Sequence, residues 1–181
     1  MNPETFIWPQ TIRLSEAARF SRATPLKRRL VADEAARQAI AQLLDLERLD
    51  ALSADLEVYG WFDGVSIEGR IRATIVQICG VSLEPFGADV DASFSLRAVP
   101  ADSPHAPAVG AEVVIDLEAD DPPDVLETDL VDLGGYVVEH LALEIDPLPR
   151  KPGVEFIPPT PSQERSPFEV LKGLKDREPS K

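Results

Sequence analysis

The stretch LSADLEVYGWFDGVSIEGRIRATI, residues 52–75, decides the fold of this chain of 181 residues. Apolar residues alternate with polar ones in both halves, a period typical of strands that bury one face. Asp63 and Gly64 separate the halves, and both tolerate the positive φ angles of a two-residue type I′ turn. The stretch therefore predicts an antiparallel hairpin with its turn at Asp63 and Gly64. Its inward positions are Leu52, Ala54, Leu56, Val58, Val65, Ile67, Ile71, Ala73 and Ile75.

Shorter elements on both sides extend this hairpin into a mainly antiparallel, twisted sheet. Further strands are predicted at residues 5–14, 26–31, 90–96 and 113–117, with residues 100–110 as a loop. Two helices are predicted to pack on the sheet, at residues 33–46 and 134–145, with Asp33 and Asp132 as their N-caps. The expected class is α+β. The helix faces that we expect to be buried are Ala36, Ile40, Leu43 and Leu44 in the first helix, and Val138, Leu141, Ala142 and Ile145 in the second.

The chain is long enough for one domain with one substantial core, which we place at residues 1–153. Residues 154–181 are expected to form a Pro-rich linker and a flexible tail, because IPPTPSQERSP holds four prolines. Ser166, Pro167 and Glu169 fit the capping box of a short helix. Such a helix is too short to be stable alone, so it would order only when docked on this domain or on a partner.

The formal net charge of -14 is concentrated in one segment. No Lys or Arg occurs between Arg97 and Arg150, whereas thirteen carboxylates do. Phosphate binding needs Lys and Arg, so this segment would repel naked nucleic acid, and a basic protein is its better electrostatic match. Part of the segment is expected to be buried in the fold, which leaves residues 118–132 as the exposed candidate surface. The predicted partner-binding residues are Glu118, Asp120, Asp121, Asp124, Glu127 and Asp129.

A basic cluster near the N-terminus offers an alternative function, direct binding of RNA. Trp8 or Trp61 would then supply a surface on which bases stack. The competing interpretation is a pair of strands with solvated cationic side chains, which we favour because strong phosphate binding is typical of a basic domain. The candidate RNA contacts are Arg13, Arg22, Lys27, Arg28 and Arg29.

Catalytic and metal-binding patterns are weak in this sequence. Residues 116–127 place carboxylates at several positions of a calcium-loop spacing, but Asp121 stands where the sharp turn needs glycine, followed by two prolines. A Mg²⁺-dependent hydrolase or nuclease using Asp120, Asp121 and Glu127 remains a third hypothesis. His105, His140 and the single Cys79 have no evident partners in sequence. We therefore assign no catalytic, cofactor or metal residue and predict that the protein is not an enzyme.

The compartment is predicted from the same composition. No apolar run is long enough to span a bilayer, so no membrane association is expected. One cysteine cannot form an internal disulfide, which agrees with a reducing environment. The expected location is the cytoplasm.

Two blocks of sequence together resemble the YceD family, also called DUF177. The first is QICGVSLEPF, residues 77–86, and the second combines residues 116–121 with residues 132–149, ending in Asp-Pro-Leu-Pro. The order and spacing of both blocks carry the resemblance, which covers roughly residues 12–153. Many members have C-x-x-C before Leu-x-Pro. Here the first position is Cys79 and the second is Ser82, so this chain lacks the thiol pair.

The resemblance implies a role in the accumulation of large-subunit (23S) ribosomal RNA, and hence in ribosome assembly, with no known reaction. Genes of this family commonly neighbour that of a small basic protein of the large subunit. The resemblance and the acidic segment together lead us to expect a basic large-subunit ribosomal protein or a pre-ribosomal particle as the partner. Contact with rRNA would be direct or indirect.

Overall fold

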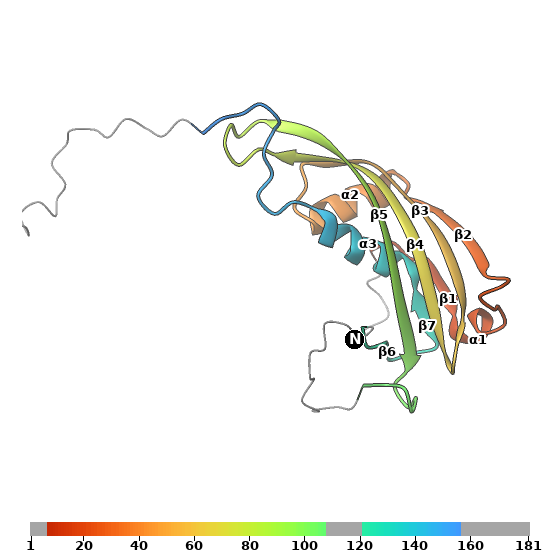
Figure 1. Ribbon diagram of the computed structural model, residues 1–181. Helices are drawn as coiled ribbons and strands as arrows, with labels where there is room; N and C mark the ends of the chain where they lie inside the picture. The colour runs from red at the N-terminus through yellow and green to blue at the C-terminus, as the bar shows by residue number, and fades with distance from the viewer. Residues whose placement is uncertain (1–6, 108–120, 157–181) are drawn as a thin grey trace, which may run out of the picture.

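The computed structural model describes residues 7–107 and 121–156 of the chain (Figure 1). A five-stranded sheet in the order β2-β3-β4-β5-β6 dominates this part. Strands β2 to β5 pair antiparallel with their neighbours, and β6 pairs parallel with β5. The expected α+β class and the mainly antiparallel sheet are confirmed. The strands are β2 (Leu26–Val31), β3 (Arg48–Trp61), β4 (Gly64–Ile78), β5 (Pro85–Pro100) and β6 (Asp124–Leu126).

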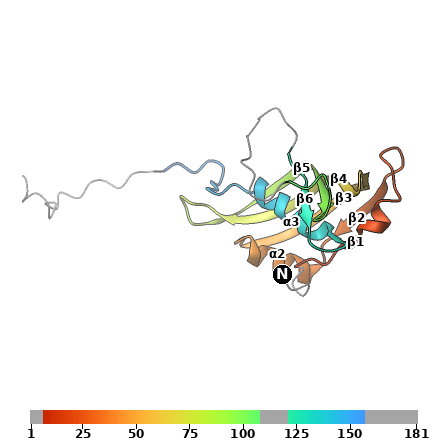
Figure 2. The same ribbon diagram turned by 90° about the horizontal axis from the view of Figure 1, so that it is seen from below.

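Helices and a second, two-stranded sheet complete the described structure. The helices are α1 (Leu14–Ala17), α2 (Glu34–Leu43) and α3 (Leu133–Glu144), and the small sheet pairs β1 (Thr11–Arg13) with β7 (Leu130–Asp132). The long strands of the main sheet bend around α2 and α3 (Figures 1 and 2). One core forms between this face of the sheet and the helices, and it includes Ile40 of α2 and Leu141 of α3.

The hairpin of β3 and β4 forms as predicted, with all of its expected inward residues buried. Val58 pairs with Ile67, and Ala54 pairs with Ile71, so one face of both strands is continuously apolar. Full burial of each Leu, Ile or Val side chain stabilises the fold by about 1.5–3 kcal/mol. The opposite, outer face of the hairpin carries the polar and charged side chains that alternate with these.

The hairpin turn differs from the predicted one by one residue. Trp61 pairs with Gly64, so the two central residues are Phe62 and Asp63, and of these only Phe62 has a positive φ, of 51°. The predicted type I′ turn centred on Asp63 and Gly64 is therefore wrong. Gly64 is needed for a different reason, because a Cβ atom there would collide with the carbonyl oxygen of Ala98 on β5.

Both predicted N-caps are confirmed, while the buried faces of the helices differ in part. The Asp33 carboxylate accepts a hydrogen bond from the Ala36 N–H at 2.8 Å, and the Asp132 carboxylate accepts one from the Gly135 N–H at 3.0 Å. Leu43 is 54% exposed, since it lies on the last turn of α2 and faces away from the sheet. Ala142 is also exposed, because Val137 takes the buried position beside Leu141.

The predicted N-terminal strand is much shorter than expected. Among residues 7–14, which the structure describes, only Thr11–Arg13 forms a strand, and Leu14 already begins α1. Residues 101–107 contain neither helix nor strand, as expected for the predicted loop. The predicted strand at residues 113–117, the linker and the short C-terminal helix lie outside the described residues.

Candidate protein-docking surface

The predicted partner-binding carboxylates that the structure describes lie on the surface of the protein. Asp121, Asp124, Glu127 and Asp129 are all exposed. Glu118 and Asp120, which the sequence assigns to the same surface, lie outside the described residues. We call the four exposed carboxylates of residues 121–129 the acidic surface.

Two sheets position the acidic surface. β6 pairs with the end of β5, with Asp124 opposite Ala98, and β7 pairs with β1 a few residues later. The carbonyl oxygen of Asp129 also accepts a hydrogen bond from the Leu14 N–H at 2.9 Å. Residues 121–132 therefore connect the main sheet to the small sheet, and β6 lies next to β5 in both views (Figures 1 and 2).

Negative charges accumulate where this segment meets α3. Burial, followed by the nearby Asp124 carboxylate, raises the pKa of both Tyr136 and Glu139. Burial also raises the pKa of Asp132, although the N–H groups of Gly135 and Gly134 oppose this. A raised carboxyl pKa means that the ionised form is disfavoured here. A cationic group brought close to Asp124 and Glu139 would reduce the part of this effect that comes from repulsion between their carboxylates.

A groove of about 470 Å³ lies beside these carboxylates. Asp121 and Asp124 line one part of it, and Arg97 and His140 line another. The ring of His140 stacks on the ring of Phe94 with centroids 4.1 Å apart, and its Nδ1 lies 2.8 Å from the carbonyl oxygen of Tyr136. The groove is open and of mixed charge, a shape suited to a chain segment that lies across the surface.

The five candidate RNA contacts do not form a free basic patch, because each side chain is paired with a carboxylate. Every one of these pairs is solvent-exposed, and such pairs contribute little stability. They nevertheless offset the positive charge that phosphate binding would use. The pairs are Arg13 with Asp129, Arg22 with Glu68, Lys27 with Glu57, Arg28 with Glu16 and Arg29 with Asp55, at nitrogen–oxygen distances from 3.0 to 3.9 Å.

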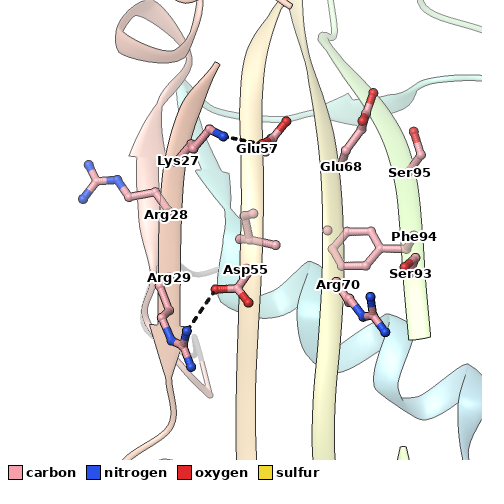
Figure 3. A pocket seen from close by; sticks show the side chains of 12 residues that line it. Lys27, Arg28, Arg29, Asp55, Glu57, Glu68, Arg70, Ser93, Phe94 and Ser95 are labelled. Carbon is pink, nitrogen blue, oxygen red and sulfur yellow. Dashed lines mark ion pairs between the residues drawn. The ribbon is translucent and has the colours of Figure 1, made fainter. Parts of the chain in front are cut away.

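Three of these basic residues line a shallow trough of about 900 Å³ across the outer face of the sheet. Figure 3 shows this face, with α3 behind the strands. Leu56 of β3 and Gly69 of β4 pair with each other and form the floor of the trough. The residues before and after each of them in sequence point outward from the sheet. Its rims carry ions of both signs, which are Lys27, Arg28, Arg29 and Arg70 against Asp55, Glu57 and Glu68. The trough is therefore close to neutral and does not attract polyanions strongly.

The two tryptophans have different environments. Trp8 is only 4% exposed, so the predicted stacking of RNA bases on this ring is wrong. Trp61 is half-buried at the tip of the hairpin, with the Arg97 guanidinium 5.1 Å from its ring centroid. Phe62 lies edge-on to Trp61 and stacks on His105 with centroids 4.1 Å apart. The sequence contains no periodic signal for this aromatic cluster, which depends on contact between the hairpin and the loop at residues 101–107.

Cys79 lies buried in the turn between β4 and β5. Its sulfur accepts hydrogen bonds from the N–H groups of Val81 and Ser82 at 3.4 Å and of Lys151 at 3.3 Å. The Ser82 hydroxyl, together with these N–H groups, lowers the pKa of the Cys79 thiol to about 6. Ser82 thus acts as a hydrogen-bond donor to Cys79. The turn at residues 79–82 is therefore held by hydrogen bonds to the Cys79 sulfur.

Neither a metal-binding cluster nor a membrane-spanning helix occurs in the described ranges. In residues 7–107 and 121–156, no group of three or more His, Cys, Asp or Glu side chains is arranged to hold a metal ion. No helix in this part of the chain has the length and apolar character needed to cross a membrane.

The fold and its surfaces define an α+β domain whose charged groups lie on open faces of a bent sheet. The family model described as "Large ribosomal RNA subunit accumulation protein YceD" matches residues 67–175, which is more than half of the chain. The protein therefore belongs to the YceD family. Searches of the curated proteins and of the solved structures found no match.

Proposed function

We propose that this protein acts in the cytoplasm as a non-catalytic factor in ribosome biogenesis, supporting the accumulation of large-subunit (23S) rRNA. Membership of the YceD family supports the connection with large-subunit rRNA. In this proposal the protein binds a basic large-subunit ribosomal protein, or a basic face of a pre-ribosomal particle, through its acidic surface. Glu118 and Asp120 are included in the proposed surface on the basis of sequence.

The observation that carries this proposal is the exposure of four carboxylates on one segment beside α3, Asp121, Asp124, Glu127 and Asp129, of which Asp129 also pairs with Arg13. Burial raises the pKa of the Glu139 carboxyl and of the Tyr136 hydroxyl, and the nearby Asp124 carboxylate raises both further. Arginine or lysine side chains of a partner would reduce this repulsion and gain charge-assisted hydrogen bonds. Binding of a basic protein would shield its charge until rRNA takes over, which is one physical route to improved rRNA accumulation.

Direct binding of rRNA is the second candidate, and the ion pairs argue against it. Each of the five basic residues already has a carboxylate partner, so phosphate would have to replace that partner. No observation favours the hydrolase hypothesis, because Asp120 lies outside the described residues and nothing supports a catalytic arrangement of Asp121 and Glu127.

The test compares two variants that have the same change in charge. The first carries Asp121→Asn, Asp124→Asn and Glu127→Gln on the acidic surface. The control carries Glu34→Gln, Asp45→Asn and Glu47→Gln on α2 and the residues that follow it. Purified basic large-subunit ribosomal proteins are titrated against the wild type and both variants, with affinity measured at low and moderate salt.

We expect the acidic-surface variant to bind at least about tenfold more weakly, equivalent to about 1.4 kcal/mol, while the control stays close to the wild type. The difference should shrink as salt rises, because screening weakens exposed charge interactions. Equal losses in the two variants would show that only net charge matters, and unchanged binding in the first variant would refute the proposed surface.

A further inference from the structure

In the part of the chain that the structure describes, one edge of the strand β5 is largely unpaired. It pairs with β4 from Pro85, opposite Ile78, to Ala98, opposite Val65. On its other side β6 pairs only with Ala98, Val99 and Pro100. Within residues 7–107 and 121–156, no strand pairs with that side of residues 85–96. Figure 1 shows β5 along the margin of the sheet opposite β2.

Among the features that usually prevent pairing with another chain, residues 87–96 have only the charged side chains of Asp89 and Asp91. Proteins protect exposed edges with charged side chains, above all lysine, and with proline, bulges or very short strands. Residues 87–96 read GADVDASFSL, with no proline and no basic residue, and their register with β4 is continuous. The edge is also long compared with a typical strand of about five or six residues. It therefore presents a regular row of backbone donors and acceptors.

Side chains near the edge leave room for another strand. Val90, Phe94 and Leu96 point toward the core but are only partly buried, whereas Ile67 and Ile71 on the adjacent β4 are fully buried. A strand beside β5 would cover these side chains on the inner face. The stacked pair of Phe94 and His140 would then lie beneath the new strand, as part of its apolar support.

The charge along this edge favours a basic segment. Asp89 and Asp91 project from the outer face of β5, where Asp89 accepts a hydrogen bond from the Thr74 hydroxyl and Asp91 forms an ion pair with Arg70 at 2.7 Å. Asp121 lies beside Ser95 and Leu96 in the groove at the end of the edge. Arg97, whose guanidinium lies over the Trp61 ring, is the basic side chain at that end. An extended peptide with Lys or Arg on alternate residues could place them near Asp89 and Asp121, whereas at Asp91 they would compete with Arg70.

We infer that residues 87–96 of β5 receive an extended, basic segment of a partner protein as an additional strand, in line with β6. Backbone hydrogen bonds to β5 supply affinity, and alternate side chains meet the aspartates on one face and the half-buried apolar side chains on the other. The inference rests on the proposed function, because it specifies how a basic ribosomal protein reaches the acidic surface. It requires backbone hydrogen bonds between β5 and the partner, which charge attraction alone does not.

Hydrogen exchange gives the first test, with an end-capped octapeptide of alternating Lys and Val as the probe. In an antiparallel pair, the amides of adjacent β5 residues point alternately to β4 and to the free edge. We expect every second amide in residues 87–96 to exchange rapidly in the free protein and to become protected when the peptide is added. Protection of all these amides in the free protein would overturn the inference, since another part of the chain or a second copy would then occupy the edge.

Two N-methylated forms of the same peptide provide the matched comparison. One carries methyl groups on the backbone nitrogens of its Lys residues and the other on those of its Val residues, so each form loses the donors of one edge. Charge and side chains are identical in both. We expect one form to bind at least about tenfold more weakly than the other. Equal affinities would overturn the strand pairing while leaving the acidic-surface proposal intact, because the latter is tested by the carboxylate variants.

Proline substitutions test the same edge from the side of the protein. Ala92→Pro and Ser93→Pro affect adjacent amides, so one of them faces β4 and the other faces the free edge. The variant that keeps the wild-type circular dichroism and thermal midpoint should lose peptide binding although every carboxylate remains. Retained binding in a folded variant of this kind would overturn the inference. If both variants unfold, the exchange and N-methyl experiments on the wild-type chain still decide.

Discussion

The sulfur of Cys79 accepts a hydrogen bond from the backbone N–H of Lys151, 72 residues later in the chain, at 3.3 Å. Two other contacts join the same segments, since the Gly80 N–H donates to the Pro149 carbonyl at 2.9 Å and Lys151 Nζ lies 2.7 Å from a carboxylate oxygen of Glu84. The turn between β4 and β5 thus holds the chain where it leaves α3. This turn and the Asp-Pro-Leu-Pro exit from α3 are the sequence blocks that indicate the family.

This relationship predicts that Cys79→Ala destabilises the protein more at alkaline than at acidic pH. The Ser82 hydroxyl and the surrounding N–H groups lower the pKa of the thiol to about 6. The folded pKa is thus below the unfolded value of about 8.5. The resulting stabilisation is fully present above the unfolded pKa and is lost as pH falls through about 6. Thermal unfolding of both proteins across this range should show a gap between midpoints that widens with pH.

Ser82→Ala provides the control for this prediction. It removes the largest cause of the lowered pKa while leaving the cysteine in place. The thiol pKa should therefore rise toward its usual value, as measured by the ultraviolet absorbance of the thiolate, and the stability of this variant should depend less on pH than that of the wild type. A gap between wild type and Cys79→Ala that is constant with pH would contradict the prediction.

A second prediction concerns Asp132, the N-cap of α3. Burial of its charge destabilises the folded protein, whereas its hydrogen bond to the helix backbone stabilises it. Asp132 accepts the Gly135 N–H, but burial raises the pKa of its carboxyl. A raised folded pKa gives a contribution that is fully present below the unfolded value, about 3.9, and lost as pH rises through the folded one. At neutral pH, Asp132→Asn should therefore be at least as stable as the wild type, because asparagine caps the helix without a buried charge.

Asp132→Ala distinguishes the cap from the charge. This variant loses the capping hydrogen bond as well as the charge. We therefore expect its free energy of unfolding in urea to be about 1 kcal/mol lower than that of Asp132→Asn. Equal stability of the alanine and asparagine variants would show that the hydrogen bond to Gly135 does not stabilise the helix.

A third prediction follows from the close approach of β4 and β5 at the hairpin. In Gly64→Ala, the new Cβ would collide with the carbonyl oxygen of Ala98 and lie 2.8 Å from a methyl carbon of Val99. Because backbone atoms cannot move aside easily, the strands must separate locally, and we expect a loss of about 1–3 kcal/mol. The measurement is urea unfolding followed by circular dichroism.

Gly87→Ala is the matched control in the same pair of strands. A Cβ atom there would meet only the Ile75 carbonyl oxygen at 3.9 Å, which is ordinary van der Waals contact. Its stability should stay within about 0.5 kcal/mol of the wild type. A Gly64→Ala protein as stable as this control would mean that the two strands can adjust without cost.

Local patterns predict the parts of the fold that depend on local physics. Period-two alternation identifies the hairpin strands, and the Asp33 and Asp132 side chains mark the starts of both long helices. The predicted turn is misplaced by one residue because its glycine is required by Ala98 on another strand, which is a tertiary contact. β1 and β7 have three residues each, too few for a periodic pattern, and their pairing depends on residues far apart in sequence.

From the sequence, the candidate surfaces could be predicted only as clusters of acidic or basic residues, without their contacts in the fold. The exposure of Asp121 and Asp124 follows from the prolines around them and the absence of an apolar pattern. By contrast, the pairing of Arg29 with Asp55 depends on the register of β2 and β3, which nothing in the local sequence specifies. A basic cluster in sequence thus becomes a row of ion pairs in the fold.

That row of ion pairs gives the fourth prediction, on the alternative of direct RNA binding. In the trough, Lys27 lies 3.0 Å from Glu57, and Arg29 lies 3.7 Å from Asp55 (Figure 3). Because both cations already have carboxylate partners, Lys27→Gln with Arg29→Gln should leave the weak binding of large-subunit rRNA fragments unchanged in gel shifts. If these residues did bind phosphates, the slope of log affinity against log salt would become shallower by about one for each phosphate that the variant no longer neutralises.

The reciprocal variant is predicted to gain affinity for RNA, and a gain can be measured even where the wild type binds weakly. Asp55→Asn with Glu57→Gln removes the partner carboxylates, so Lys27 and Arg29 become available to phosphate, although Asp55 also pairs with Arg72 at 2.9 Å. We expect this variant to bind the same rRNA fragments more tightly than the wild type at low salt and to lose that gain at high salt. Tighter binding in this variant together with no loss in the Lys27 and Arg29 variant would show that the sheet face is neutralised by its own carboxylates. The opposite pair of results would establish the trough as an RNA-binding site.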